Sequence, residues 1–436
     1  MAGRGKRLPA PRRTGAEPLR ILYLHQHHSG PGGSTATRSD GLARALAAQG
    51  HAVTLACGRY DGAVSGLDGP FRRGRREGRL GGVRVVEFDI PCGNAMPLRG
   101  RAGAFLRFAA HATPLALRAE FDLVVASSTP LTVAIPALAA HAARGTPFVF
   151  EIRDPWPEVP RALGGVPRPV LAAMESLANA ACRRAAAVVA LSDGMAETAR
   201  ARGADPARVH VVPNGCDLHA FGPHVAPWRP HQAAAWECLA VYAGAHGRAN
   251  GLGALLDAAA LLRARGEHRL RILLVGQGAE KPALVARADA EGLDNVTFLD
   301  PLPRAALGGL YAGSQVALHL LAGLPAFAEW TAPNKIMDGL AAGLPVVTNQ
   351  AGRAARIVAT GPSGIAVPAG DAAALADALT RLAADPALRA RMGGAARRQA
   401  VTTWDRRLLA ERFCAVIEEA GRRAPPPPRA LAGVAR

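Results

Sequence analysis

The chain has 436 residues, of which 49% are hydrophobic and 20% charged, so it is long enough for two or three folded domains. Its formal net charge is +18, from 52 basic and 34 acidic side chains, which favours nucleic acid, an anionic membrane surface or a phosphorylated substrate as partner. Aromatic residues make up only 5%, and no stacking ladder, zinc-finger or RNA-recognition signature accompanies the arginines, so nucleic acid is excluded as the expected partner.

The basic side chains gather in three clusters, for each of which a solvated, arginine-biased surface is the alternative to a binding role. The clusters are Arg4, Lys6, Arg7, Arg12 and Arg13; Arg72, Arg73, Arg75, Arg76 and Arg79; and Arg99, Arg101 and Arg107. No secretory signal is expected, because the apolar run 21–24 is too short for a signal core. The uncharged stretch 123–143 contains two prolines and predicts a buried strand and a short helix, not a membrane span.

The six cysteines form no Cys-x-x-Cys pair, which favours buried or free thiols in a reducing compartment over disulfides or a zinc site. We expect a cytoplasmic protein, and peripheral contact with an anionic membrane at its inner face stays open.

The first half of the chain alternates short apolar runs with helical patterns. After a basic tail at 1–18 that we expect to be disordered, strands are predicted at 20–25, 53–57, 83–88, 123–126, 148–151, 187–191 and 209–212, with a helix at 34–49. Residues 58–82, rich in Gly and Arg, are predicted as a loop or insertion. Strand–helix alternation implies crossover units and a parallel sheet, which we assign to a first domain at 19–218.

A linker at 219–236, rich in Pro and His, leads to a second alternating series. Strands are predicted at 239–243, 271–275, 296–299, 316–320, 345–348 and 364–367, and long helices at 371–383 and 405–420. The second domain covers 237–404, and a disordered tail at 422–436 contains four consecutive prolines. The expected fold is α/β, with two doubly wound, Rossmann-like parallel-sheet domains that face a cleft, because such sheets bind ligands at the carboxyl ends of their strands.

A glycine-rich turn follows the first strand. Its residues Gly32, Gly33 and Ser34 would bring backbone N–H groups and a helix N-terminus to a phosphate, although a plain strand–helix turn also uses glycine. The turn is not Gly-x-Gly-x-x-Gly, and no acidic residue closes the second strand, which disfavours a dinucleotide.

Lysine is rare in this chain: only Lys6, Lys281 and Lys335 occur beside 49 arginines. Lys281 ends a Gly-x-Gly-x-x-Lys loop and Lys335 stands in Pro-Asn-Lys, so both are predicted to face a diphosphate, the alternative being two chance surface lysines. Arg248 follows another strand in the same topological position as Lys281. Two cations from successive strand ends would clamp a diphosphate leaving group.

The helix that starts at Asn334 would add its N-terminal N–H groups to this site. Asp338, one turn later, could accept hydrogen bonds from sugar hydroxyls, or could simply keep the helix soluble.

Motifs in both halves resemble the retaining family-4 glycosyltransferases. They are Gly32-Gly33-Ser34; Phe150-Glu151-Ile152-Arg153-Asp154-Pro155-Trp156-Pro157-Glu158; the run 211–217; the loop ending in Lys281; and the run 333–347. The second of these is similar to the WbuB-like branch of bacterial surface-polysaccharide assembly. The resemblance implies a GT-B fold with an acceptor-binding first domain, a nucleotide-sugar-binding second domain, and a last helix at 405–421 that crosses back to the first.

The resemblance also implies residue roles. Arg248 and Lys281 match the pyrophosphate-binding pair, Gly33 matches the loop glycine at the donor, and Asp154 matches a residue near the reacting sugar. Asp338 matches the second carboxylate of the family's Glu-x7-Glu motif, which holds the ribose. The first carboxylate is absent, because Trp330 stands there and Glu329 is one position away.

We therefore expect a retaining glycosyltransferase that moves a sugar from a nucleotide diphosphate sugar to a hydroxyl, sugar or lipid-linked acceptor, with Asp154, Arg248 and Lys281 catalytic. No cofactor and no metal is expected, since the sequence has no Asp-x-Asp loop and no histidine cluster with ligand spacing. His25, His27 and His28 are predicted as solvated loop histidines, with a local site as the alternative. Asp154 is either a catalytic helper or a cap before Pro155. The alternative functions are a nucleotide-sugar epimerase on the same scaffold and a non-catalytic nucleotide-sugar-binding protein.

Overall fold

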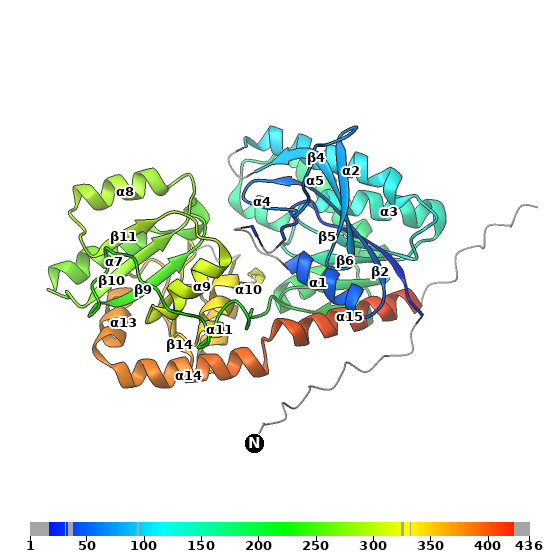
Figure 1. The fold of residues 1–436 in the computed structure, drawn as a ribbon. Helices are drawn as coiled ribbons and strands as arrows, with labels where there is room; N and C mark the ends of the chain where they lie inside the picture. The colour runs from blue at the N-terminus through cyan, green and yellow to red at the C-terminus, as the bar shows by residue number, and fades with distance from the viewer. Residues whose placement is uncertain are drawn as a thin grey trace, which may run out of the picture.

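The computed structural model describes residues 17–30, 32–33, 38–93, 96–323, 327–331 and 333–422. Figure 1 shows two α/β bodies, with two long helices in succession along their lower edge that connect the second body back to the first. The predicted tails at 1–18 and 422–436 lie almost entirely outside the described residues, as does Ser34.

The first body is built on an eight-stranded sheet with the order β3-β4-β2-β1-β5-β6-β7-β8. Its strands are β1 (Arg20–Leu24), β2 (Ala52–Tyr60), β3 (Arg75–Leu80), β4 (Val83–Cys92), β5 (Leu123–Ser127), β6 (Phe148–Ile152), β7 (Ala187–Ala190) and β8 (Val209–Val211). All neighbours are parallel except β3, which pairs antiparallel with β4. Residues 58–82 were predicted as a loop or insertion, and the loop alternative is wrong for part of this segment, because β2 runs to Tyr60 and β3 forms the edge of the sheet.

Helices cover both faces of this sheet. They are α1 (Arg38–Ala48), α2 (Leu98–Ala116), α3 (Ala134–Arg144), α4 (Glu158–Leu163), α5 (Arg168–Arg184), α6 (Asp193–Ala201) and the last helix of the chain, α15 (Arg406–Arg422). The apolar sides of α2, α3, α5 and α6 pack on one face, and those of α1 and α15 on the other. Burial of these apolar faces is the main source of the body's stability.

The second body has a six-stranded parallel sheet with the order β11-β10-β9-β12-β13-β14. Its strands are β9 (Cys238–Ala243), β10 (Leu270–Val275), β11 (Val296–Leu299), β12 (Val316–His319), β13 (Val346–Thr348) and β14 (Gly364–Ala366). Its helices are α7 (Gly253–Ala264), α8 (Lys281–Ala290), α9 (Arg304–Ala312), α10 (Phe327–Trp330), α11 (Asn334–Ala342), α12 (Arg353–Thr360), α13 (Ala372–Ala384) and α14 (Pro386–Thr402).

Three segments join the bodies. The stretch 219–236 contains no helix or strand and lies against α9, where the Trp228 indole donates to the Ala306 carbonyl at 2.7 Å. Helix α15 follows α14 and packs on α1, with Phe413 and Ile417 buried beside strands of the first sheet. Helix α10 reaches α6, where the Ser192 hydroxyl donates to the Glu329 carbonyl at 2.8 Å.

In the part of the chain that the structure describes, no helix combines the length and apolar character needed to cross a bilayer.

Candidate functional site

Two glycine-containing loops interlock at the carboxyl ends of β9 and β10. These strands are parallel neighbours that end in register at Ala243 and Val275, so their following loops lie together. A Cβ on Gly276 would lie 2.0 Å from the Gly244 carbonyl oxygen, and one on Gly278 would lie 2.3 Å from the His246 carbonyl oxygen. Only glycine permits this approach, because any side chain would push the two loops apart.

Lys335 enters the same place from α11. Its Nζ lies 5.1 Å from the centre of the Tyr242 ring, and a Cβ on Gly244 would lie 2.2 Å from its Cε. Burial lowers the pKa of Lys335 to about 8, although the nearby Asp338 raises it. Among the described residues, no carboxylate lies within ion-pair distance of this ammonium. A desolvated cation held over a ring and without a counter-ion is suited to bind an external anion.

His246 lies beside Lys335 in the loop after β9. Its ring is buried, and neither nitrogen has a hydrogen-bond partner in the structure. Burial and then the charges of Lys281 and Lys335 lower its pKa to about 4, so the imidazole is neutral at pH 7. Two residues later the exposed Arg248 begins a short 3-10 turn, and its guanidinium has no protein partner among the described residues.

Lys281, which was predicted to face a diphosphate, contacts three oxygen atoms of the protein in the structure. Its Nζ donates to the carbonyls of Gly276 at 3.0 Å and Leu299 at 3.1 Å, and to the Asp300 carboxylate at 2.8 Å. These contacts fasten the Gly276–Gly278 loop to the end of β11. The Lys281 ammonium is therefore paired with a carboxylate, whereas that of Lys335 has no such partner among the residues that the structure describes.

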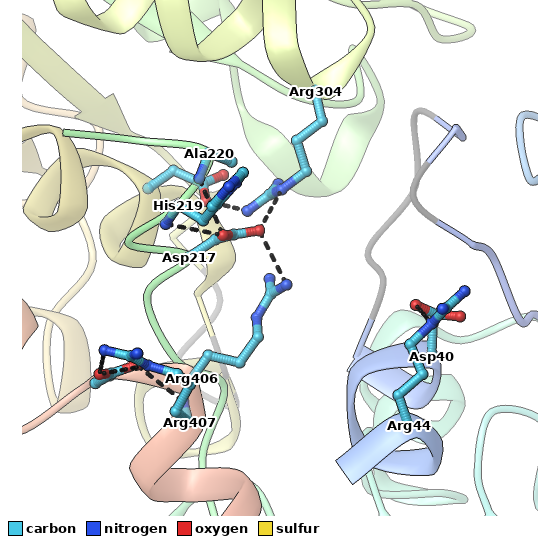
Figure 2. A network of polar contacts seen from close by, with 10 residues as sticks. Asp40, Arg44, Asp217, His219, Ala220, Arg304, Arg406 and Arg407 are labelled. Carbon is cyan, nitrogen blue, oxygen red and sulfur yellow. Dashed lines mark hydrogen bonds and ion pairs between the residues drawn. The ribbon is translucent and has the colours of Figure 1, made fainter. Parts of the chain in front are cut away.

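Asp338 belongs to a chain of ion pairs at the junction of the bodies. Arg304 donates to Asp338 at 2.9 Å and to Asp217 at 3.2 Å, and Arg406 of α15 donates to Asp217 at 3.0 Å. Figure 2 shows the Asp217 carboxylate between the two guanidinium groups, with the backbone of His219 and Ala220 on its other side. Asp338 therefore pairs with Arg304, a residue that the sequence analysis did not single out. The only signal for Arg304 in the sequence is its position in the segment that follows β11.

Glu329, the alternative first carboxylate, forms a two-pronged ion pair with Arg356, at 2.7 and 2.5 Å. The neighbouring Trp330 packs partly against the core of the first body. The position where the motif requires an acid is therefore occupied by an interdomain packing residue.

The turn after β1 is held closely against the first body. The amide of Gly30 donates to the Val64 carbonyl at 2.7 Å, and a Cβ on Gly33 would lie 2.1 Å from the Ser29 hydroxyl. Gly32 has open space around it. Glycine at 33 is thus required by packing, and this requirement alone explains it without any ligand.

Four polar residues gather at the carboxyl ends of β1, β5 and β6. The exposed Asp154 accepts a hydrogen bond from Thr129 at 2.6 Å, and Arg153 contacts the Nε2 of His25. The prediction of solvated loop histidines is wrong for His25 and His28, which are both only 2% exposed. Burial and the Arg153 charge hold the pKa of His25 well below its usual range, so it is neutral at pH 7.

Below this layer, Glu151 is fully buried and pairs with Arg38 at 2.9 Å. It also accepts hydrogen bonds from Ser127 at 2.5 Å and Tyr23 at 3.1 Å. Among the described residues, no group of three His, Cys, Asp or Glu side chains is arranged to hold a metal ion.

Two family models match the chain. The model described as Glycosyltransferase Family 4 matches residues 35–220, and the model described as Glycosyl transferases group 1 matches residues 237–385. The D-inositol 3-phosphate glycosyltransferase of Kribbella flavida is 33% identical over 260 residues, covering 56% of each chain. That of Pseudarthrobacter chlorophenolicus is 33% identical over 211 residues, covering 47% of this chain and 49% of the relative. The chain thus spans about half the length of the curated relatives it matches.

Solved structures resemble the whole fold. Sucrose-phosphate synthase from Thermosynechococcus elongatus superposes with a TM-score of 0.72 at 19% identity, covering 91% of this chain and 98% of that chain. Anabaena HepE in complex with UDP and glucose superposes with a TM-score of 0.66 at 19% identity and the same coverage. At these identities the likeness establishes the arrangement of the two bodies, and function is argued from the site.

Proposed function

Because the chain belongs to glycosyltransferase family 4 and has the GT-B fold, we propose that it transfers a sugar from a nucleotide diphosphate sugar to a hydroxyl acceptor with retention of anomeric configuration. The carrying observation is the Lys335 ammonium, which is desolvated beside Tyr242 and faces no carboxylate among the described residues. Such a cation, next to interlocked glycine loops and a helix N-terminus, suits a diphosphate.

In the proposed reaction the bond between the anomeric carbon and the diphosphate oxygen breaks while the acceptor oxygen forms its bond to that carbon. Lys335, the first N–H groups of α11 and Arg248 stabilise the negative charge that develops on the departing diphosphate. The acceptor proton passes to the leaving diphosphate oxygen. Neutral His246 can donate one hydrogen bond without adding charge.

Lys281 is proposed as a positioning residue, because its ammonium holds the Gly276–Gly278 loop through the Gly276 carbonyl. Asp338 is proposed to orient Arg304 toward the nucleotide. For Glu329 to bind the donor sugar, its ion pair with Arg356 would have to break. Asn334, at the start of α11, is proposed to bind the diphosphate.

The acceptor is proposed to bind where Asp154 and Arg153 lie in the first body, beside the turn that contains Gly32 and Gly33. The relatives are named for D-inositol 3-phosphate, so this compound is the first acceptor to test. A sugar or lipid-linked acceptor of surface-polysaccharide or glycolipid synthesis, as in the WbuB-like branch, is the second, with the reaction at the inner face of a membrane that the basic first body contacts.

Release of nucleoside diphosphate from UDP- and GDP-sugars, with and without these acceptors, tests the function. We expect acceptor-dependent release and a loss of turnover of about 10²–10³-fold in Lys335→Ala. Lys281→Ala is the matched control and should lose less turnover but more thermal stability. If Lys281→Ala instead lost more turnover than Lys335→Ala, the earlier predicted Arg248–Lys281 clamp would be favoured.

The same assay separates the alternatives. An epimerase would convert the sugar with no acceptor, and a non-catalytic binding protein would bind nucleotide sugar without any conversion. Either result would contradict the transferase proposal.

A further inference from the structure

A cavity of about 610 Å³ lies at the junction of the two bodies. Its walls are α12 and the second half of α14, the helix along the lower edge of the second body (Figure 1). Asp193, at the start of α6, borders it from the first body, and Trp404, between α14 and α15, also lines it. None of its lining residues belongs to α11 or to the loops after β9 and β10, so this cavity is separate from the proposed donor site.

Three arginines line this cavity, together with one carboxylate, that of Asp193. Arg398 is exposed, and its guanidinium has no partner in the described part of the chain. Arg356 pairs with Glu329, whose side chain is 44% exposed. Arg353 pairs with Asp193 at 3.3 Å. The cavity therefore has an excess of positive charge, and the carboxylates that reduce it are in contact with solvent.

The charge of Arg353 is poorly compensated for its degree of burial. Its side chain is 8% exposed, as are those of Arg38 and Arg202. The carboxylates that pair with Arg38 and Arg202 are 0% and 14% exposed, whereas Asp193 is 70% exposed. Burial lowers the pKa of Arg353, although the Asp193 charge raises it. A desolvated guanidinium with a solvated counter-ion is suited to bind an anion from solution.

Two buried donors at this cavity lack an acceptor. The Nε of Arg353 and the indole nitrogen of Trp404 have no hydrogen-bond partner among the described residues. The two groups are neighbours, because the guanidinium carbon lies 5.9 Å from the centre of the Trp404 ring. Guanidinium and indole groups only donate hydrogen bonds, so a ligand that satisfies them must supply acceptor oxygens. A phosphoryl group has three such oxygens and matches the fork of an arginine.

We propose that this cavity binds a phosphoryl group between Arg353, Arg356 and Arg398, carried either by inorganic phosphate or by a small phosphorylated metabolite. The phosphoryl group takes the place of Asp193 on Arg353 and of Glu329 on Arg356. It carries a charge of about −1.5 to −2 at pH 7, more than either of these exposed carboxylates.

Occupancy of this site changes the contact between the bodies. Asp193 belongs to α6 and Arg353 to α12, so the anion breaks an ion pair that joins the first body to the second. It also releases Glu329 from Arg356, the pair that must break before Glu329 can bind the donor sugar. Phosphate and the nucleotide sugar should therefore each raise the affinity for the other. This coupling rests on the proposed function, whereas the anion site itself does not.

Calorimetric titration of the full chain with inorganic phosphate, at an ionic strength held constant with KCl, tests the site. We expect saturable binding that Arg398→Gln weakens roughly tenfold, since this arginine donates charged hydrogen bonds to the ligand. Asp193→Asn removes the competing carboxylate and should tighten binding roughly two- to fivefold. The matched control is Arg391→Gln, an exposed arginine of α14 outside the cavity, which should leave binding unchanged.

Three results would overturn the site: no saturable binding, equal losses in Arg398→Gln and Arg391→Gln, or weaker binding in Asp193→Asn. Loss of binding in Lys335→Ala with normal binding in Arg398→Gln would also overturn it, because the phosphate would then lie in the donor pocket. Glycerol 3-phosphate separates the two sources. Tighter binding of this compound than of phosphate would identify an organic phosphate, and equal or weaker binding would identify inorganic phosphate.

Turnover of the nucleotide sugar tests the coupling. Added phosphate should lower the KM for the nucleotide sugar in the natural chain and should have no such effect in Arg398→Gln. An unchanged or raised KM, together with intact phosphate binding, would refute the coupling and leave the site. Phosphate binding without any turnover would refute the transferase alone, and normal turnover without phosphate binding would refute the site alone.

Discussion

Lys281 and Lys335 show how two lysines predicted to do the same work differ once their neighbours are known. Lys281 has three oxygen acceptors, including the Asp300 carboxylate. Lys335 has an aromatic ring and the backbone of Gly244 beside it. Sequence composition identified both residues, because lysine is rare here, but it could not tell which one the protein neutralises by itself. That distinction depends on where Asp300 and Tyr242 lie in space.

Diphosphate affinity should fall as the pH rises above about 8. The folded pKa of Lys335 is lowered to about 8 by burial, so its ammonium is lost as pH passes that value, and a diphosphate binds the charged form. We expect UDP or GDP affinity to decrease roughly tenfold per pH unit between pH 8 and 9.5, measured by calorimetry. Lys335→Arg stays charged over this range and should remove the dependence. A flat profile for the natural chain would contradict the assignment.

Glu151→Gln should destabilise the first body strongly. Burial alone would raise the pKa of Glu151, but the charges of Arg38 and Arg153 and the hydrogen bond from Ser127 outweigh it, and the pKa is lowered. The carboxylate therefore stabilises the fold above its unfolded pKa, and this contribution is lost as pH falls through the folded value. The variant leaves the buried Arg38 guanidinium bonded to the Val212 and Pro213 carbonyls but without its carboxylate counter-charge, which should cost about 3–5 kcal/mol in urea unfolding at pH 7.

Glu175→Gln is the matched control for Glu151→Gln. Its partner Arg161 and Glu175 itself are both nearly half exposed, so the loss should stay below about 1 kcal/mol. An equal loss of unfolding free energy in the two variants would show that the buried ion pair stabilises the fold no more than the exposed one.

At the scale of elements, hydrophobic runs in the sequence predicted the strands well, whereas two elements without a clear apolar pattern were not predicted separately. Every predicted strand coincides with an observed one, because strands buried on both faces are continuous apolar runs. Strand β3 reads Arg-Arg-Glu-Gly-Arg-Leu and lies at the sheet edge, where no apolar signal is needed. The sequence does not predict α14 as a separate helix, because its apolar residues do not gather on one helical face.

The sequence shows glycines in the loops after β9 and β10, but only the structure shows why glycine is needed at these positions. The sequence analysis assigned a role in this loop to Lys281 alone, whereas the structure shows that Gly276 and Gly278 are required by the close contact between two protein loops. The partner loop comes from a different strand, so no local pattern could reveal it.

Gly276→Ala should separate the loops after β9 and β10. The added Cβ would lie 2.0 Å from the Gly244 carbonyl oxygen, at a φ of 146° that non-glycine residues rarely adopt. We expect a loss of about 1–3 kcal/mol in stability and a larger loss of nucleotide affinity. Gly103→Ala in α2, where nothing lies within 4 Å, should leave nucleotide affinity unchanged and should raise stability slightly. Normal nucleotide affinity in Gly276→Ala would count against a site between these loops.

At the scale of the whole molecule, ion pairs and one crossing helix connect the two bodies. Asp217 belongs to the segment that connects the two sheets along the chain. Its carboxylate accepts hydrogen bonds from Arg304 of α9 and from Arg406 of α15 (Figure 2). The crossing of the last helix was implied by family resemblance, and the structure packs α15 on α1. No property of the local sequence predicts this charge network, because its members are almost 190 residues apart.

Asp217→Asn should loosen the junction between the bodies. The guanidinium groups of Arg304 and Arg406 would lose their shared counter-charge, which should cost about 1.5–3 kcal/mol. Thermal unfolding should move to lower temperature, and small-angle scattering should report a larger radius of gyration. Asp377→Asn removes an exposed pair with Arg265 and should change neither quantity. An unchanged scattering profile for Asp217→Asn would mean that packing of α15 alone holds the bodies together.

Because the chain has only three lysines, the lysine in the proposed donor pocket can be studied by chemical modification. An amine reacts with acylating reagents in its neutral form, and at pH 8 roughly half of Lys335 is neutral. The Lys281 nitrogen is tied up by three oxygens, and Lys6 is the only other lysine side chain. Acylation at mildly alkaline pH should therefore modify Lys335 in addition to the α-amino group and Lys6, and protection of the Lys335 peptide by added UDP, measured by peptide mapping, would report occupancy of the donor pocket.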